Sequence, residues 1–181
     1  MAFKKYFASL VSAFILMSIF VSCSGPEEKA MKFFEKGQGF FEKGDYVKAR
    51  LEFKNCLQVK PGFAKGYYML GMVELREKNW KKAFGLLSKA TELDENLLDA
   101  HVALGKLFVI AKQQEQAMEK AELVLGKKPD HEDALLLKAS VLSVGQKDQE
   151  AEAILQSLIK KNPEKPGHTS TPAPRFRKPD P

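Results

Sequence analysis

Small and apolar residues recur along this chain of 181 residues at a constant step of 34 positions. The first column is entirely alanine, at Ala49, Ala83, Ala117 and Ala151. A second column holds small residues, at Gly37, Gly71, Gly105 and Ala139. A third column is mostly proline, at Pro61, Glu95, Pro129 and Pro163. Three columns in one phase predict four tandem units, at 30–63, 64–97, 98–131 and 132–163.

Within each unit the apolar residues follow a helical spacing. Spacings of three and four place Phe33, Gly37 and Phe40 on one face of a helix. The cluster Lys43-Gly44-Asp45 favours a turn, and a second helical pattern follows it. Small residues let the two helices approach closely, and large residues fill the space between successive pairs. Since one pair cannot bury its apolar face alone, we expect stability to come from stacking.

The columns resemble the tetratricopeptide (TPR) repeat, whose 34-residue pattern is W-x2-L-G-x2-Y…A-x3-F…P. The second unit shows the pattern in Tyr67, Leu70, Gly71, Ala83 and Leu87. The resemblance covers 30–163 and implies an all-α fold, a right-handed superhelical solenoid of about four helix–turn–helix repeats. It also implies a binding role in place of a catalytic one.

The first 22 residues have the pattern of a secretory signal, because Lys4-Lys5 precede an uncharged stretch. The end of that stretch, Phe20-Val21-Ser22-Cys23, resembles the bacterial lipobox. The resemblance implies that Cys23 is lipidated and that 23–29 form a short linker to the repeats. Ser24, where retained lipoproteins have Asp, implies the outer membrane, facing the periplasm. An uncleaved membrane anchor is the alternative, because the uncharged stretch is just long enough to span a bilayer.

The charge of the chain is concentrated at its ends. The formal net charge is +6, but residues 24–163 contain 23 basic and 21 acidic residues. A nearly neutral repeat region disfavours a nucleic-acid partner. Residues 164–181 are rich in proline, serine and threonine and carry most of the remaining basic residues. This composition predicts a disordered basic tail.

No catalytic or metal-binding motif is recognisable in the sequence. The zinc-protease, serine-hydrolase and phosphate-loop motifs are all missing. The three histidines are isolated from any Cys, His or Asp at ligand spacing. We therefore expect no enzyme activity, no cofactor, no metal and no small-molecule substrate. Acidic residues are expected mostly on solvated faces, and Cys56 is expected to be a packed thiol because its column also holds Ala90, Val124 and Leu158.

The TPR resemblance implies that a protein or peptide partner binds in a concave groove lined by the first helices. The positions carried over are Phe34, Gln38, Phe41, Glu42, Lys65, Tyr68, Met72, Leu75, Arg76, Asp99, Val102, Lys106, Val109, Ile110, Asp133, Leu136, Ser140 and Ser143. Their apolar members suit an amphipathic helix or an extended apolar peptide. Some of these apolar residues could equally belong to the core, and Val109 and Ile110 fit the groove and the core equally well. Relatives that clamp chaperone C-termini have Lys and Asn where this chain has Phe34 and Gln38, so that activity is not expected.

A narrower resemblance comes from Ala49-Arg50-Leu51-Glu52-Phe53-Lys54-Asn55 and the run 67–90, following a lipobox. These segments are similar to longer TPR lipoproteins linked to bacterial exopolysaccharide and exosortase (PEP-CTERM) export loci. The resemblance implies a membrane-anchored scaffold that binds a protein partner in envelope export or assembly. Type IV pilus-assembly lipoproteins share the layout and are an alternative. A further alternative is an accessory subunit that positions an envelope enzyme.

Overall fold

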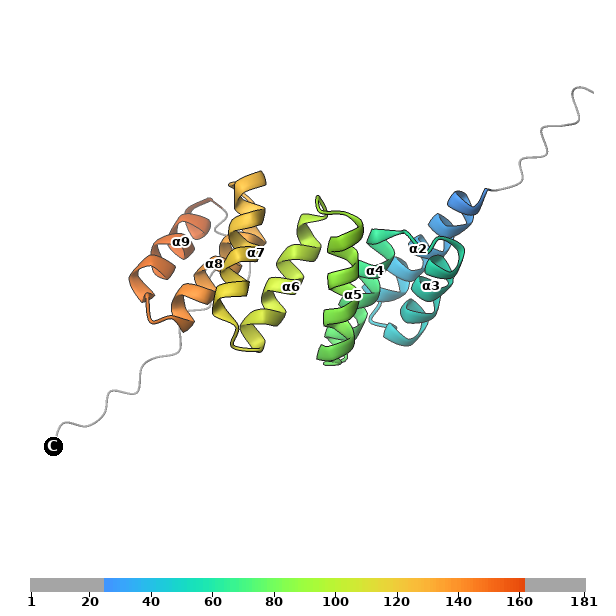
Figure 1. The fold of residues 1–181 in the computed structure, drawn as a ribbon, viewed down its shortest axis with the longest axis horizontal. Coiled ribbons are helices and arrows are strands. Elements are labelled where there is room, and N and C mark those ends of the chain that lie inside the picture. The colour runs from blue at the N-terminus through green and yellow to red at the C-terminus, as the bar shows by residue number, and fades with distance from the viewer. Residues whose placement is uncertain (1–24, 162–181) are drawn as a thin grey trace, which may run out of the picture.

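A computed structural model describes residues 25–161, which form eight α-helices and no strand. The helices are α2 (Pro26–Glu42), α3 (Tyr46–Val59), α4 (Ala64–Arg76), α5 (Trp80–Leu93), α6 (Leu98–Ile110), α7 (Gln114–Lys127), α8 (Glu132–Val144) and α9 (Asp148–Lys161). They follow one another along the long axis of the molecule (Figure 1). The predicted signal, the lipidation site Cys23 and the predicted tail 164–181 lie outside the described residues.

The prediction of an all-α helical repeat is confirmed, since the helices form four successive pairs. The first helix begins at Pro26, within the segment 23–29 that was expected to be a linker. The 34-residue step is also present in the backbone hydrogen bonds of the turn within each pair. In each of the four turns, a backbone N–H donates to the carbonyl oxygen five residues earlier. These bonds run from Asp45 to Phe40 (2.9 Å), from Asn79 to Glu74 (2.9 Å), from Gln113 to Phe108 (2.8 Å) and from Lys147 to Leu142 (2.9 Å). Each bond satisfies a carbonyl that the helix end would otherwise leave without a partner. The turns are therefore one structural motif used four times.

The small-residue columns mark the points where helices approach most closely. A Cβ atom at Gly37 would lie 2.6 Å from the ring of Phe53, in the second helix of the same pair. At Gly105 it would lie 2.4 Å from Leu137, which belongs to the next pair. Ala83, from the alanine column, is completely buried. Gly37 thus closes a contact within a repeat, whereas Gly105 closes one between repeats.

The hydrophobic core of the described residues is a series of four clusters, each of which shares a helix with the next. One cluster joins α2, α3 and α4, and the next joins α4, α5 and α6. Two further clusters join α6 to α8 and α8 to α9. The first helices of the repeats, α4, α6 and α8, each contribute to two successive clusters, so each repeat completes the core of its neighbour.

Each turn within a helix pair contains one residue in the left-handed region of backbone space. These residues are Gly44, Lys78, Lys112 and Gln146, with φ values of 77°, 60°, 60° and 63°. A side chain at positive φ costs about 1–2 kcal/mol because Cβ approaches the following carbonyl. Only the first repeat has the glycine that avoids this strain. The other three turns are therefore less stable than they would be with glycine at this position.

We expect Lys112→Gly to raise the free energy of unfolding by about 1 kcal/mol, because it removes the Cβ strain at φ 60°. Chemical denaturation of the purified protein measures the change. Lys112→Ala is the matched control, since it removes the charge but keeps a Cβ at the same φ. Equal denaturation midpoints for Lys112→Gly and Lys112→Ala would contradict the assignment of strain to this turn.

Candidate functional site

The first helices of the middle repeats enclose a hollow, which we name the α4–α6 groove. Its volume is ≈ 140 Å³, and its lining residues are Tyr68, Met72, Leu75, Asp99, Val102, Ala103, Lys106 and Asp133. All of these except Ala103 occupy positions that the sequence predicted for a concave groove. The structure thus brings them around one hollow, and their role in binding stays a prediction.

The α4–α6 groove has an apolar floor and a charged rim. Tyr68, Met72 and Leu75 pack against the buried cluster shared by α5 and α6. On the rim, Nζ of Lys106 lies 3.1 Å from a carboxylate oxygen of Asp133. Asp99 lies 3.3 Å from Nε2 of His131, whose Nδ1 accepts the backbone N–H of Ala134. Both rim carboxylates therefore have a partner within the protein.

Tyr68 is the polar group at the floor of this groove. Burial raises the pKa of its phenol to about 12, and the nearby carboxylates of Asp99 and Asp133 add to this shift. The hydroxyl therefore stays protonated and neutral at physiological pH. Since it makes no hydrogen bond to another described residue, it is free to donate one to a ligand.

The other predicted groove residues do not gather at this hollow. Phe34 needs a correction: it is 7% exposed and packs in the core, with ring centroids 5.8 Å from Phe53 and 5.1 Å from Phe63. Its side chain is enclosed by α3 and by the loop before α4, which sequence spacing does not reveal. Val109 packs against the core of α6 to α8, whereas Ile110 is 54% exposed.

Further predicted groove residues lie on α2 and α4, away from the hollow, and Leu136, Ser140 and Ser143 of α8 do not line it either. The ring of Phe41 stacks near Tyr46, at 5.5 Å between centroids, and Arg76 lies over it at 6.0 Å. Gln38 is half-buried, and Lys65 is exposed. The residues on α2 and α4 extend the first-helix surface towards the N-terminal repeat without lining the groove itself.

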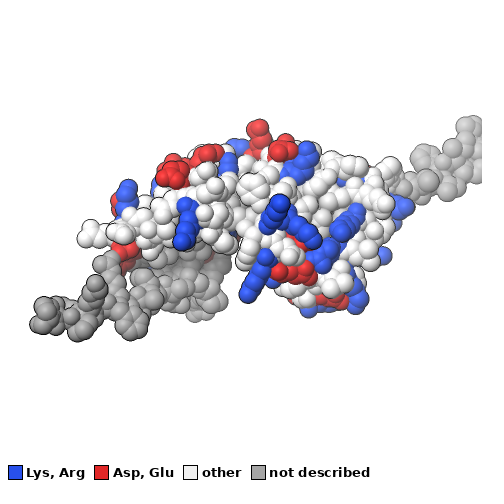
Figure 2. Space-filling model, turned by 60° about the horizontal axis from the view of Figure 1, so that its bottom comes forward, with Lys and Arg blue, Asp and Glu red and all other residues white. Residues whose placement is uncertain are grey.

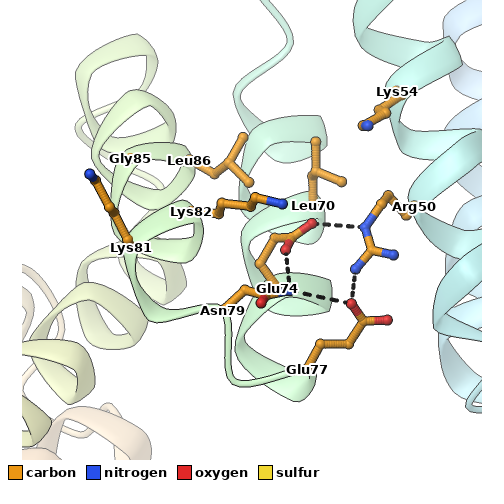
Figure 3. Close-up of a pocket in the computed structure, with 10 residues that line it drawn as sticks. All are labelled: Arg50, Lys54, Leu70, Glu74, Glu77, Asn79, Lys81, Lys82, Gly85 and Leu86. Atoms are coloured by element: carbon orange, nitrogen blue, oxygen red, sulfur yellow. Dashed lines mark hydrogen bonds and ion pairs between the residues drawn. The ribbon is translucent and has the colours of Figure 1, made fainter.

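A second open site, which we name the α3–α5 cleft, was not predicted from the sequence. It has a volume of ≈ 540 Å³ and is lined by Arg50, Lys54, Leu70, Glu74, Glu77, Asn79, Lys81, Lys82, Gly85 and Leu86. Figure 3 shows how Arg50 and Asn79 converge on Glu74 at its base. Nε of Arg50 lies 2.8 Å from Oε1 of Glu74, and Nδ2 of Asn79 lies 2.8 Å from Oε2. A terminal guanidinium nitrogen of Arg50 also binds Glu77.

Glu74 is the unusual residue in this cleft, because it is a carboxylate that is only 4% exposed. The same column in the other repeats holds apolar residues, Phe40, Phe108 and Leu142. Burial opposes ionisation, but the hydrogen bonds from Arg50 and Asn79 hold the pKa of Glu74 below its ordinary value. The glutamate at an apolar position was the signal in the sequence that could have revealed this site.

Cys56 and His101 are buried residues that lie outside both sites. Cys56 is a free thiol in the core, and burial raises its pKa. His101 is 6% exposed, and neither ring nitrogen has a hydrogen-bond partner among residues 25–161. Burial lowers its pKa, which the nearby backbone of Glu95 offsets only in part, so the ring is neutral. Within 25–161 no three His, Cys, Asp or Glu side chains lie close enough to hold a metal ion.

Solved structures with the same fold are TPR proteins. YrrB, a TPR protein with an unusual peptide-binding site, aligns with 75% of this chain and 70% of its own, at 24% identity and a TM-score of 0.62. PilF of Pseudomonas aeruginosa aligns with 79% of this chain and 65% of its own, at 18% identity and a TM-score of 0.71. The second TPR domain of human RPAP3, in complex with an HSP70 peptide, aligns with 65% of this chain and 98% of its own, at 21% identity and a TM-score of 0.60. The chain therefore has the TPR solenoid fold.

No protein-family model matches the chain, and no curated protein matches it. Among the helices of residues 25–161, none is both long and apolar enough to cross a membrane.

We expect Arg50→Leu to lower the free energy of unfolding by about 2 kcal/mol at neutral pH, because it leaves the buried Glu74 carboxylate with Asn79 as its remaining partner. Since the folded pKa of Glu74 is depressed, the stabilisation is present above the unfolded pKa and is lost as the pH falls through the folded value. The difference between the two proteins should therefore shrink in acid.

The matched variant for this test is Arg50→Leu with Glu74→Leu, which removes the carboxylate together with its partner. It should recover most of the lost stability, because the column is apolar in the other repeats. Urea denaturation at several pH values measures both effects. A double variant no more stable than Arg50→Leu would show that the buried carboxylate is not the source of the loss.

Proposed function

We propose that this protein is a binding scaffold without catalytic activity, which holds a segment of a partner protein in the α4–α6 groove. The observation behind the proposal is the hollow itself, with an apolar floor, the phenol of Tyr68 and a charged rim. This combination, an apolar centre surrounded by polar groups, is the common anatomy of a protein interface.

The size of the groove favours a peptide side chain over a small molecule. Pockets for small molecules usually occupy about 300–1,000 Å³. The groove has ≈ 140 Å³, which is room for one large apolar side chain. The remainder of the partner would cross the rim, where Asp99, Lys106 and Asp133 are all exposed. The hydroxyl of Tyr68 would then donate to a backbone carbonyl of the bound segment.

Two proteins with the same fold support a peptide as the ligand. The RPAP3 domain is bound to an HSP70 peptide, and YrrB has a peptide-binding site. Both are less than 25% identical to this chain, so they indicate the class of ligand and not its sequence.

We further propose that the scaffold is lipid-anchored in the bacterial envelope, at the outer membrane facing the periplasm. The support is the signal pattern of residues 1–22 and the lipobox-like Ser22-Cys23. A role in exopolysaccharide or PEP-CTERM (exosortase) export rests on the sequence resemblance of 49–55 and 67–90. A type IV pilus-assembly lipoprotein and an accessory subunit for an envelope enzyme are the alternatives. The likeness to PilF concerns the fold and does not separate them.

Replacing both Tyr68 and Met72 by alanine should weaken binding of the partner by at least ~2 kcal/mol, the scale of an interface hot spot. The partner is first identified by co-purification from envelope extracts, and its affinity for the wild-type and variant proteins is then measured. Leu70→Ala is the control for folding, because Leu70 is 5% exposed and belongs to the core. Its thermal unfolding temperature should fall further than that of the double variant. A double variant that stays folded and binds normally would place the partner on another surface.

Cys23→Ala should abolish acylation, because the thiol of Cys23 is the acceptor that the lipobox pattern requires. Metabolic labelling with a palmitate analogue in a bacterial host measures the attached lipid. Cys56→Ala is the matched control, since Cys56 is the buried cysteine and its removal should leave labelling unchanged. Label that persists on Cys23→Ala would contradict the anchor.

A further inference from the structure

The α3–α5 cleft is an open, charged site that shares no lining residue with the α4–α6 groove. Its position between α3 and α5 places it on the second helices of the first two repeats, whereas the groove belongs to the first helices. We propose that the α3–α5 cleft binds an acidic peptide segment of a partner protein, and that it does so independently of the α4–α6 groove.

The charge of the cleft favours an anionic ligand. Its lining residues include four cations, Arg50, Lys54, Lys81 and Lys82, and two carboxylates. Both carboxylates are already bound within the cleft, Glu74 by Arg50 and Asn79, and Glu77 by Arg50. In contrast, none of the three lysines forms an ion pair with another described residue. In Figure 2 the basic side chains gather over the half of the module that contains the N-terminal repeats.

Arg50, Lys54 and Lys82 are directed at the same space, whereas the side chain of Lys81 points away from it (Figure 3). In Figure 3 the ammonium groups of Lys54 and Lys82 extend towards each other from α3 and α5, above the guanidinium of Arg50. Arg50 uses Nε and one terminal nitrogen for the two glutamates, which leaves its other terminal nitrogen as a donor. The glutamates hold the guanidinium in a fixed orientation, so a carboxylate entering the cleft would meet a preorganised donor.

The repeat itself shows that the fold does not require these charges. One unit further along the chain, the positions of the four cations are occupied by Phe84, Ser88, Glu115 and Gln116. Two units further along they are occupied by Met118, Glu122, Gln149 and Glu150. The scaffold at these positions is the same, so the cation cluster is particular to the first two repeats. The buried Glu74, which orients Arg50, is particular to the same place.

The shape of the cleft favours a peptide over a membrane surface. The side chain of Arg50 is 22% exposed and lies at the base, where a flat layer of headgroups could not reach it. A Cβ atom at Gly85 would meet nothing within 4 Å, so the wall is open there, whereas the next repeat has Glu119 at that position. Leu70 and Leu86 provide an apolar floor for the methylene groups of glutamate side chains.

The test uses the full-length chain in a non-ionic detergent and a fluorescein-labelled oligoglutamate peptide, with binding followed by fluorescence anisotropy. We expect saturable binding that weakens with salt. Lys54→Gln with Lys82→Gln should raise the Kd about tenfold, since it removes two of the cations that line the cleft. The matched control is Lys36→Gln with Lys128→Gln, two exposed lysines elsewhere, and its Kd should change less than about twofold.

Three results would overturn the proposal. One is a wild-type protein that does not bind the peptide at low salt. Another is an equal loss of affinity in the control variant, which would mean attraction by net charge alone. The third is a protein that does not bind the peptide but binds phosphatidylserine vesicles through Lys54 and Lys82. That result would assign the cleft to lipid headgroups. Tyr68→Ala with Met72→Ala should leave peptide affinity unchanged, so a failure of the groove proposal is distinguishable from a failure here.

Discussion

Burial of each helix pair against the next pair is the interaction on which this structure depends. A single pair exposes an apolar face that it cannot cover, and the clusters shared by α4, α6 and α8 show that the neighbouring repeat covers it. Close approach of helices is also required, within a pair at Gly37 and Gly71 and between pairs at Gly105, which is why these residues are glycine. Once the stack is formed, the residues outside its core are free to differ between repeats, and function can be placed there.

The fold could be predicted from the sequence because its period is a property of spacing. Alanine and glycine at a 34-residue step are visible without coordinates, and so is the turn at Gly44. Spacing does not reveal which neighbour a side chain meets. Gly105 makes its closest approach to Leu137 of the next repeat, and Phe34 lies between Phe53 and Phe63 and not in the groove.

The groove was foreseeable in position, since the repeat defines which residues of the first helices share a face. The cleft was not foreseen, because acidic residues were expected mostly on solvated faces and Glu74 is buried. Its pairing with Arg50 joins residues 24 positions apart on different helices, which a pattern along one helix cannot show. In a repeat protein, a polar residue in an otherwise apolar column is therefore a useful sign of a functional site.

Native-state hydrogen exchange of the backbone amides tests the continuity of the stack most directly. A continuous core predicts a single gradient of opening free energy, highest in α4 to α7 and falling towards α2 and α9, since the terminal helices have a neighbour on one side among the described residues. A division at the α5–α6 boundary, with the two halves opening independently under the same conditions, would contradict it. That result would make the module two separate repeat pairs, and the α4–α6 groove would not be a fixed surface.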